Sequence, residues 1–304
     1  MTAPDAGTIG TTGDNHRSPG RHSGPPTARA HRWPLKAYMA LIVAVSMMVA
    51  AAGAIFVRRA SINNARRSAV SEAQFGAGLA ARAVASDIEL LRTTVGATAA
   101  NPAISHVFEN STGCTLTFGG GDAFESGHID VVDSGGAVRC TSLQSPEDVG
   151  YGNSPWLSRA LEHPVVEGPV TDPRTGRLVL VVAAPVPGRG IVVSFADLNS
   201  LGSALSDHFG GPHNLEYIVT SADQRTILTR SVDSVRWVGK PTTNTSFAPD
   251  RRGTPTRDVD GKSRLYGNAD VPGIGWATWA GADASDAVTA ARRLAQQEAA
   301  IVLV

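Results

Sequence analysis

The chain has 304 residues, a net charge of zero at pH 7 and 6% aromatic residues. Because nucleic-acid-binding domains carry an excess of basic charge, this balance argues against a nucleic-acid partner. The length leaves room for about two domains. At the start of the chain, residues 1–36 are rich in Pro, Gly, Ser and Thr and show no apolar periodicity. This composition predicts a disordered tail, which we place in the cytoplasm.

An uncharged apolar segment follows at residues 37–57 (AYMALIVAVSMMVAAAGAIFV). A helix of that length reaches about 30 Å, the thickness of the hydrocarbon core of a bilayer. Only a helix satisfies its own backbone in lipid, so the segment predicts a transmembrane anchor. A cleaved signal peptide is the alternative, with a cleavage site at the Ala50-Ala51-Ala52 triplet. The long polar region before the segment and the length of the apolar run favour an anchor.

Residues 58–100 predict a stalk helix. Between residues 61 and 99 there is no proline, and apolar residues recur in steps of three to five, which is the pattern of one helical stripe. The stripe packs either on a second copy of the chain or, in its upper half, on the domain that follows. Its members are Val70, Phe75, Leu79, Val84, Ile88, Leu91 and Val95.

The chain has two cysteines, Cys114 and Cys140, and both follow the apolar segment. An isolated even pair in a membrane-tethered domain predicts a disulfide, and two buried, inert thiols are the alternative. A disulfide would place residues 58–298 on the extracytoplasmic side, because such bonds persist in oxidising compartments.

Strand patterns begin within residues 101–209, the first predicted module. Two apolar strands joined by a Ser-Gly-Gly turn predict a hairpin at residues 129–140. Nearly unbroken apolar runs at residues 177–184 and 190–196 predict strands buried in a sheet. A connecting helix is expected at residues 197–209.

The same order of elements returns within residues 210–282, the second predicted module. A second hairpin of the same shape is expected at residues 216–230, and strands at residues 264–268 and 275–280 complete a smaller sheet. Residues 283–298 predict an exit helix, and residues 299–304 (AAIVLV) predict the start of a second span. The predicted fold class is α+β, with a long N-terminal helix and two antiparallel-sheet modules.

The order and spacing of these segments resemble those of double Cache domains, the tandem PAS-like sensor domains of bacterial membrane receptors. The resemblance covers residues 61–290 and implies that the module farther from the membrane holds the ligand, while the nearer one transmits. The segments that carry it are residues 129–140, 154–160 (SPWLSRA), 168–176 (GPVTDPRTG), 179–185 and 237–241 (WVGKP).

The resemblance also indicates where a ligand would bind. Amino-acid-sensing members have an Arg two positions before the Trp and an aromatic residue just after it. Here Ser154 and Leu157 stand at those positions around Trp156, and Phe195 stands where an Asp is expected. Since an arginine fork grips a carboxylate, its absence argues against an amino-acid ligand. The expected ligand-binding residues are Trp156, Tyr151, Ser154, Arg159, Ser194 and Asp197.

No catalytic set emerges from the sequence. Residues 120–124 (GGDAF) resemble the hairpin of diguanylate cyclases, but Ala123 replaces the essential Glu. The eight histidines show no metal-ligand spacing. Arg139, Arg159 and Arg174 would serve as anion donors if they turned inward. We therefore expect no enzyme activity, no metal and no cofactor.

The predicted function is small-molecule sensing by the extracytoplasmic part of a bacterial transmembrane receptor. The expected partners are the membrane, a second copy bound through the stalk, and a cytoplasmic output domain such as a histidine kinase or nucleotide cyclase beyond this chain. A single-span anchored extracellular enzyme or adhesion module and a truncated receptor without output are the alternatives.

Overall fold

The computed structural model describes residues 34–144, 149–211, 214–245, 247, 254–287 and 289. Residues 1–53 and 54–304 form two compact units. The predicted tail, most of the exit helix and the predicted second span lie outside the described residues. A helical turn does begin at residue 284, directly after the last strand.

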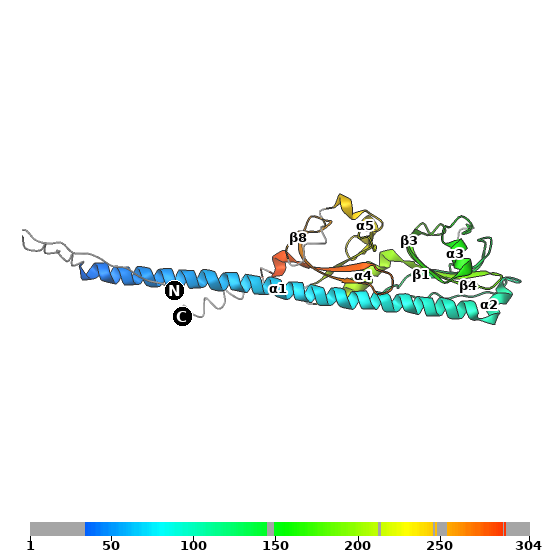
Figure 1. The fold of residues 1–304 in the computed structure, drawn as a ribbon, viewed down its shortest axis with the longest axis horizontal. Coiled ribbons are helices and arrows are strands. Elements are labelled where there is room, and N and C mark those ends of the chain that lie inside the picture. The colour runs from blue at the N-terminus through cyan, green and yellow to red at the C-terminus, as the bar shows by residue number, and fades with distance from the viewer. Residues whose placement is uncertain are drawn as a thin grey trace, which may run out of the picture. The chain divides into compact units, whose positions relative to one another are not determined.

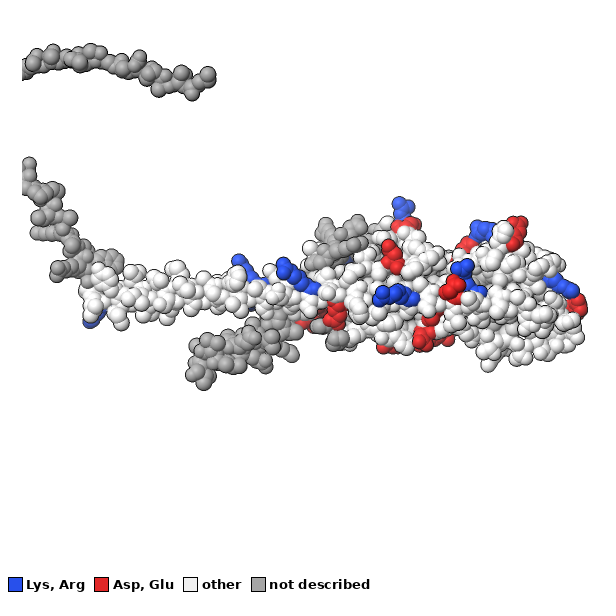
Figure 2. Space-filling view, turned by 60° about the horizontal axis from the view of Figure 1, so that its bottom comes forward, with Lys and Arg blue, Asp and Glu red and all other residues white. Residues whose placement is uncertain are grey.

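Helix α1 (Leu35–Ala100) is continuous for 66 residues through the predicted anchor and stalk. Its first part is long and apolar enough to cross a membrane, and none of that stretch is buried. Figure 2 shows this part as an almost entirely white rod, with acidic and basic side chains gathered on the folded modules. The predicted anchor therefore exists as an exposed apolar helix.

The first module holds a five-stranded antiparallel sheet in the order β2-β1-β5-β4-β3, as expected from the hairpin and the two apolar runs. Helix α1 runs along one side of this sheet (Figure 1). The predicted connecting helix is confirmed as α4 (Leu198–Phe209). The other elements are α2 (Pro102–Val107), β1 (Gly127–Asp133), β2 (Val138–Thr141), α3 (Leu157–Glu162), β3 (Val165–Thr171), β4 (Leu178–Val186) and β5 (Gly190–Asp197).

The second module repeats this topology strand for strand, in the order β7-β6-β10-β9-β8. The predicted second hairpin is confirmed as β6 and β7, and the predicted strands as β9 and β10. The α+β fold class with two similar sheets behind one long helix is thus confirmed. The elements are β6 (Glu216–Thr220), β7 (Ile227–Arg230), α5 (Ser234–Trp237), a 3-10 turn (Thr242–Asn244), β8 (Thr256–Arg257), β9 (Ser263–Asp270) and β10 (Ala277–Asp283).

The face of α1 that packs on the modules differs from the predicted stripe in its lower half. Above Val84 the buried residues are the predicted ones, so the upper half packs on its own domain. Below it the buried positions are almost all Ala or Gly, and Phe75 is 65% exposed. Small side chains let the helix approach the second sheet closely. The buried residues of the lower half are Ala69, Ala73, Gly76, Ala77, Ala80 and Ala81.

The contact is tightest at Gly267 of β9. A Cβ atom there would lie 2.1 Å from the backbone nitrogen of Gln74 on α1. The Gln74 side chain also donates to the carbonyl oxygen of Asn268 at 2.5 Å and accepts from its N–H at 3.2 Å. Because these neighbours are backbone atoms of a helix, they cannot turn aside as a side chain can.

Replacing Gly267 with Ala should therefore lower the free energy of unfolding by about 1–3 kcal/mol, the usual cost of overpacking. Gly78 on α1 is the matched control, since a Cβ there meets no atom within 4 Å. Gly78→Ala should raise the free energy of unfolding by up to about 1 kcal/mol through helix propensity. Chemical denaturation followed by tryptophan fluorescence measures both. Equal effects of the two substitutions would contradict the close approach of helix and sheet.

The predicted disulfide is confirmed. Cys114 and Cys140 are bonded, with their Cα atoms 6.0 Å apart and 26 positions apart in the chain. The bond attaches the segment that follows α2 to strand β2, near the edge of the first sheet.

Candidate functional site

Two polar residues of the first sheet, His128 and Asp130, lie on the face away from α1. His128 and Asp130 of β1 stand opposite Phe195 and Val193 of β5. Successive side chains of a strand point to opposite faces, so Ile129 between them packs in the core shared with α1. The outer face therefore carries an imidazole and a carboxylate from one strand beside an aromatic ring from the next.

Two segments cover these side chains, the loop before α3 and the turn after β3. The Tyr151 hydroxyl donates to Asp130 Oδ2 at 2.8 Å and lies 3.4 Å from Asp172 Oδ1. The Arg174 guanidinium donates to Asp130 Oδ2 at 2.6 Å and to Thr141 Oγ1 at 3.1 Å. Asp130 and Asp172 are fully buried and Arg174 is 6% exposed. The turn thus places a buried ion pair over the sheet.

His128 belongs to the same cluster. Its Nε2 lies 3.3 Å from the Tyr151 hydroxyl, 3.6 Å from Asp130 Oδ2 and 3.7 Å from Asp172 Oδ2. Burial lowers the pKa of His128 below 6.5, although the two carboxylates act in the opposite direction. Burial likewise raises the pKa of Tyr151, which stays protonated as a donor. Burial thus favours the uncharged form of the His128 imidazole within this cluster.

The lowered pKa of His128 predicts a loss of stability in acid. The unfolded chain, with a His pKa of about 6.5, takes up the proton first as the pH falls. The free energy of unfolding should therefore decrease below pH of about 6.5, until the folded-state pKa is passed. His128→Gln should flatten this slope between about pH 7 and pH 5, whereas His163→Gln, at an exposed position, should leave it unchanged. Denaturation curves across this range measure the effect, and equal slopes in all three proteins would contradict it.

Four rings fill the outer face of the first sheet. His128 and Phe195 stack with centroids 4.6 Å apart, and Tyr151 and Phe195 stack at 4.9 Å. Trp156 meets Tyr151 at 5.6 Å and the edge of Phe195 at 5.8 Å. Trp156 is 1% exposed, so it forms part of the core of this face.

A cavity of about 330 Å³ opens beside this ring cluster. His128 and Phe195 contribute to its lining, and Asp197 and Arg177 bring opposite charges to it. Asp197 Oδ2 accepts from Arg177 at 2.6 Å. Asp197 also caps α4, because its Oδ1 accepts from the N–H of Asn199. The Arg177 side chain is 61% exposed. The remaining lining residues are Ser126, Gly127, Leu143, Thr175 and Val179.

The structure brings three of the six predicted ligand residues to this region: Tyr151, Trp156 and Asp197. Ser194 stands opposite Ile129 in the register of β1 and β5, and strand alternation therefore turns it toward α1. Ser154 closes a turn, with its N–H donating to the carbonyl of Tyr151, and it does not line the cavity.

The predicted anion donors divide between surface and core. The Arg159 side chain is 59% exposed and pairs with Glu167, outside the cavity. Arg139 pairs with Asp133 at 2.7 Å on the surface. Arg174 does turn inward, and its guanidinium forms an ion pair with Asp130 at 2.6 Å. His128 was not among the predicted site residues; it lies one residue before the predicted hairpin at residues 129–140 and two positions before Asp130, and in the structure it belongs to β1.

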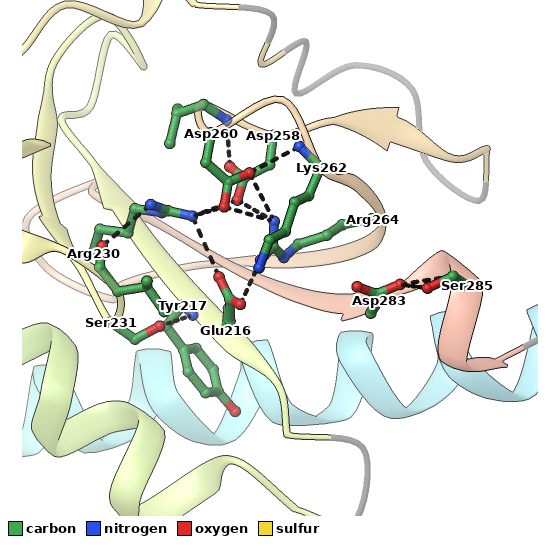
Figure 3. A network of polar contacts seen from close by, with 12 residues as sticks. Glu216, Tyr217, Arg230, Ser231, Asp258, Asp260, Lys262, Arg264, Asp283 and Ser285 are labelled. Atoms are coloured by element: carbon green, nitrogen blue, oxygen red, sulfur yellow. Dashed lines mark hydrogen bonds and ion pairs between the residues drawn. The ribbon is translucent and has the colours of Figure 1, made fainter.

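The second module contains a larger ionic cluster (Figure 3). Arg230 is fully buried, and its Nη2 lies 2.8 Å from both Asp258 Oδ2 and Asp260 Oδ2. Arg264 Nη1 lies 2.7 Å from Asp258 Oδ2, and Arg264 also pairs with Glu216. Burial alone would raise the pKa of Asp260, but the Lys262 N–H and the two guanidinium groups lower it to about 2.

This cluster has the carboxylate spacing of a cation site. Oxygens of Glu216, Asp258 and Asp260 lie within 4.8 Å of one another. The guanidinium groups of Arg230 and Arg264 already lie among them. Two guanidinium groups thus pair with the three carboxylates within the module.

The fold is α+β, with two modules of the same sheet topology carried on one long helix. No protein-family model matches the chain, and no curated protein matches it. Among solved structures, the ligand-binding domain of the Pseudomonas fluorescens chemoreceptor CtaA in complex with L-leucine is 18% identical, with a TM-score of 0.51 over 74% of this chain and 99% of that one.

Two further ligand-binding domains are similar at lower TM-scores. The domain of the Pseudomonas aeruginosa PAO1 chemoreceptor PctB with L-Gln is 17% identical, with a TM-score of 0.48 over 72% of this chain and 91% of that one. The domain of Mlp24 with asparagine is 18% identical, with a TM-score of 0.48 over 78% and 99%. The likeness to CtaA confirms the fold that the resemblance to double Cache domains predicted.

Proposed function

We propose that this chain is the sensing part of a bacterial transmembrane receptor and that its first module binds a small molecule. The observation that carries the proposal is the cavity of about 330 Å³ beside His128, Phe195 and Asp197, in a fold shared with a domain that binds L-leucine. Its volume lies within the range of about 300–1,000 Å³ that is typical of ligand pockets.

The lining of the cavity suggests the kind of ligand. The Arg177 guanidinium can donate a hydrogen bond to an acceptor group of a ligand, and the Asp197 carboxylate can accept one from a donor group of the same ligand. The Arg177 side chain is 61% exposed and can move aside, whereas that of Asp197 is only 5% exposed, so a ligand that displaces Arg177 must itself donate to the Asp197 carboxylate. We infer a small polar molecule that presents both kinds of group against the ring of Phe195.

Tyr151 and Trp156 do not line the cavity but pack against Phe195, which does. They contact Phe195, so a change at the cavity reaches them through stacked rings. Asp197 caps α4, which continues the chain toward the second module. A ligand that binds one arrangement of these elements more tightly than another would shift their equilibrium by that difference in affinity.

A thermal-shift screen of the full chain in nanodiscs tests the site. Amino acids, organic acids and amines are the compounds to screen, because a ligand at 100 times its Kd stabilises the folded state by about 2.7 kcal/mol. Asp197→Asn should weaken any hit, since it removes the charge and keeps a residue that can cap α4. Asp207→Asn, on the exposed face of the same helix, is the control. The proposal fails if no compound raises the Tm, or if Asp197→Asn leaves every affinity unchanged.

We place the modules outside the cytoplasm, with α1 as the membrane anchor. The apolar part of α1 and the disulfide support this orientation, because disulfides persist in oxidising compartments. The exposed Phe75 and Leu90 of α1 would contact a second copy. A histidine kinase or nucleotide cyclase in the cytoplasm would receive the signal.

The extracytoplasmic orientation can be tested on the two cysteines. A membrane-impermeant thiol reagent should label them in intact cells after reduction. Labelling that requires permeabilised cells would refute the orientation.

A further inference from the structure

A second cavity, of about 840 Å³, lies where α1, the first sheet and two turns of the second module meet. Its walls come from α1, from β3 and β4, and from the turns that follow β6 and β9. It shares no lining residue with the cavity at Asp197. Ligand pockets occur preferentially at such junctions between modules.

The floor of this cleft is apolar. Ile88 of α1, Leu180 of β4 and Trp276 before β10 line it, and their exposed fractions are 4%, 1% and 4%. Each floor residue comes from a different part of the fold. A molecule seated there would contact the stalk helix and both modules at once.

The rim of the cleft is acidic. Glu89, Glu167 and Asp223 line it together with the guanidinium of Arg92. Glu167 also pairs with Arg159, which lies outside the lining, and both of these side chains are at least 36% exposed. Glu89 and Arg92 pair at 3.1 Å, and both side chains are more than half exposed. The β3–β4 ladder breaks its register between Glu167 and Val170, a kind of irregularity that re-aims side chains at the edge of a sheet.

Asp223 brings a carboxylate to the rim from the turn after β6. Its Oδ1 accepts from the Arg225 N–H at 3.0 Å and from the Ser221 hydroxyl, and both bonds lie within its own turn. Asp223 and Glu167 reach the cleft from opposite modules. The rim thus brings three carboxylates against the guanidinium groups of Arg92 and Arg159, and an excess of negative charge attracts a cation.

We propose that this cleft binds a small organic amine, a compound with an apolar body and a protonated ammonium group. The body would lie on Ile88, Leu180 and Trp276, and the ammonium would bind the carboxylates of Glu167 and Asp223. An occupant that contacts both modules favours the arrangement in which both sets of contacts form. The cleft is therefore a second ligand site, separate from the cavity of the first module, whose occupation can change the arrangement of the two modules.

Isothermal titration of the full chain in nanodiscs of zwitterionic lipid tests the proposal, with empty nanodiscs as the blank. The probe is 2-phenylethylamine, and 2-phenylethanol is its uncharged counterpart. The amine should bind, and the double substitution Glu167→Gln with Asp223→Asn should raise its Kd by about tenfold or more. Both substitutions keep the size of the side chain, and the amide that replaces the Asp223 carboxylate retains an acceptor for the turn.

Two control variants locate the binding. Glu162→Gln removes a carboxylate of α3 outside the cleft, and Asp197→Asn alters the cavity of the first module. Neither should change the Kd of the amine by more than about twofold. The proposal is overturned if the amine fails to bind at about 10 mM, if the alcohol binds as tightly, or if Asp197→Asn weakens binding while the double substitution does not.

Discussion

Arg230→Met is expected to lower the free energy of unfolding by about 3–5 kcal/mol, the largest effect of any single substitution proposed for this chain. The guanidinium of Arg230 is fully buried and lies 2.8 Å from oxygens of both Asp258 and Asp260. Asp258 is itself 1% exposed. Without Arg230, three carboxylates face Arg264 alone, and buried carboxylates without a partner cost far more than the pair gains.

Urea denaturation followed by tryptophan fluorescence measures this effect, because Trp276 and Trp279 lie in the same module. Arg92→Met is the matched control, since it breaks an ion pair whose side chains are 54% and 61% exposed. Surface pairs contribute about 0–1 kcal/mol. Similar losses for Arg230→Met and Arg92→Met would show that the buried cluster does not stabilise the second module.

Replacing both cysteines with alanine is expected to lower the free energy of unfolding by about 3.5 kcal/mol. Cys114 and Cys140 are 26 positions apart, and closing a loop of that length restricts the unfolded chain by about this amount in the chain-entropy model. The substitution removes no charge and little buried surface, so the loss arises mainly in the unfolded state.

The control for this prediction is the wild-type chain under reducing conditions. Reductant should shift its denaturation midpoint toward that of the double variant and should leave the double variant itself unchanged. A double variant as stable as the oxidised wild-type chain would show that the bond does not stabilise the fold.

The local periodicities of the sequence were enough to predict the elements of the fold. The apolar run at residues 37–57 predicted a transmembrane helix, and the structure has a helix there that is long and apolar enough to cross a membrane. The predicted hairpins at residues 129–140 and 216–230 appear as β1–β2 and β6–β7. These features depend on neighbouring residues, since a helix or a hairpin closes its hydrogen bonds within a short stretch of chain. The two cysteines are also bonded as expected.

Which side of a strand faces the ligand could not be read from the sequence alone. Ser194 and Phe195 are neighbours in β5, yet one points to α1 and the other to the ring cluster. A side-chain period of two makes this choice depend on register with another strand. For that reason Ser194 lies away from the cavity that we propose as the site, whereas His128 lines it.

The sequence alone thus determined the order of the elements, the apolar helix and the paired cysteines, because each follows from short-range pattern or chemistry. The tertiary structure decided the small-residue face of α1 and the ionic clusters. Arg230 of β7 and Arg264 of β9 are 34 positions apart in the sequence, and the pairing of β7 with β6, of β6 with β10 and of β10 with β9 brings them to the same carboxylates. Contacts between residues so distant in the chain depend on how sheets stack and align, which no local pattern encodes.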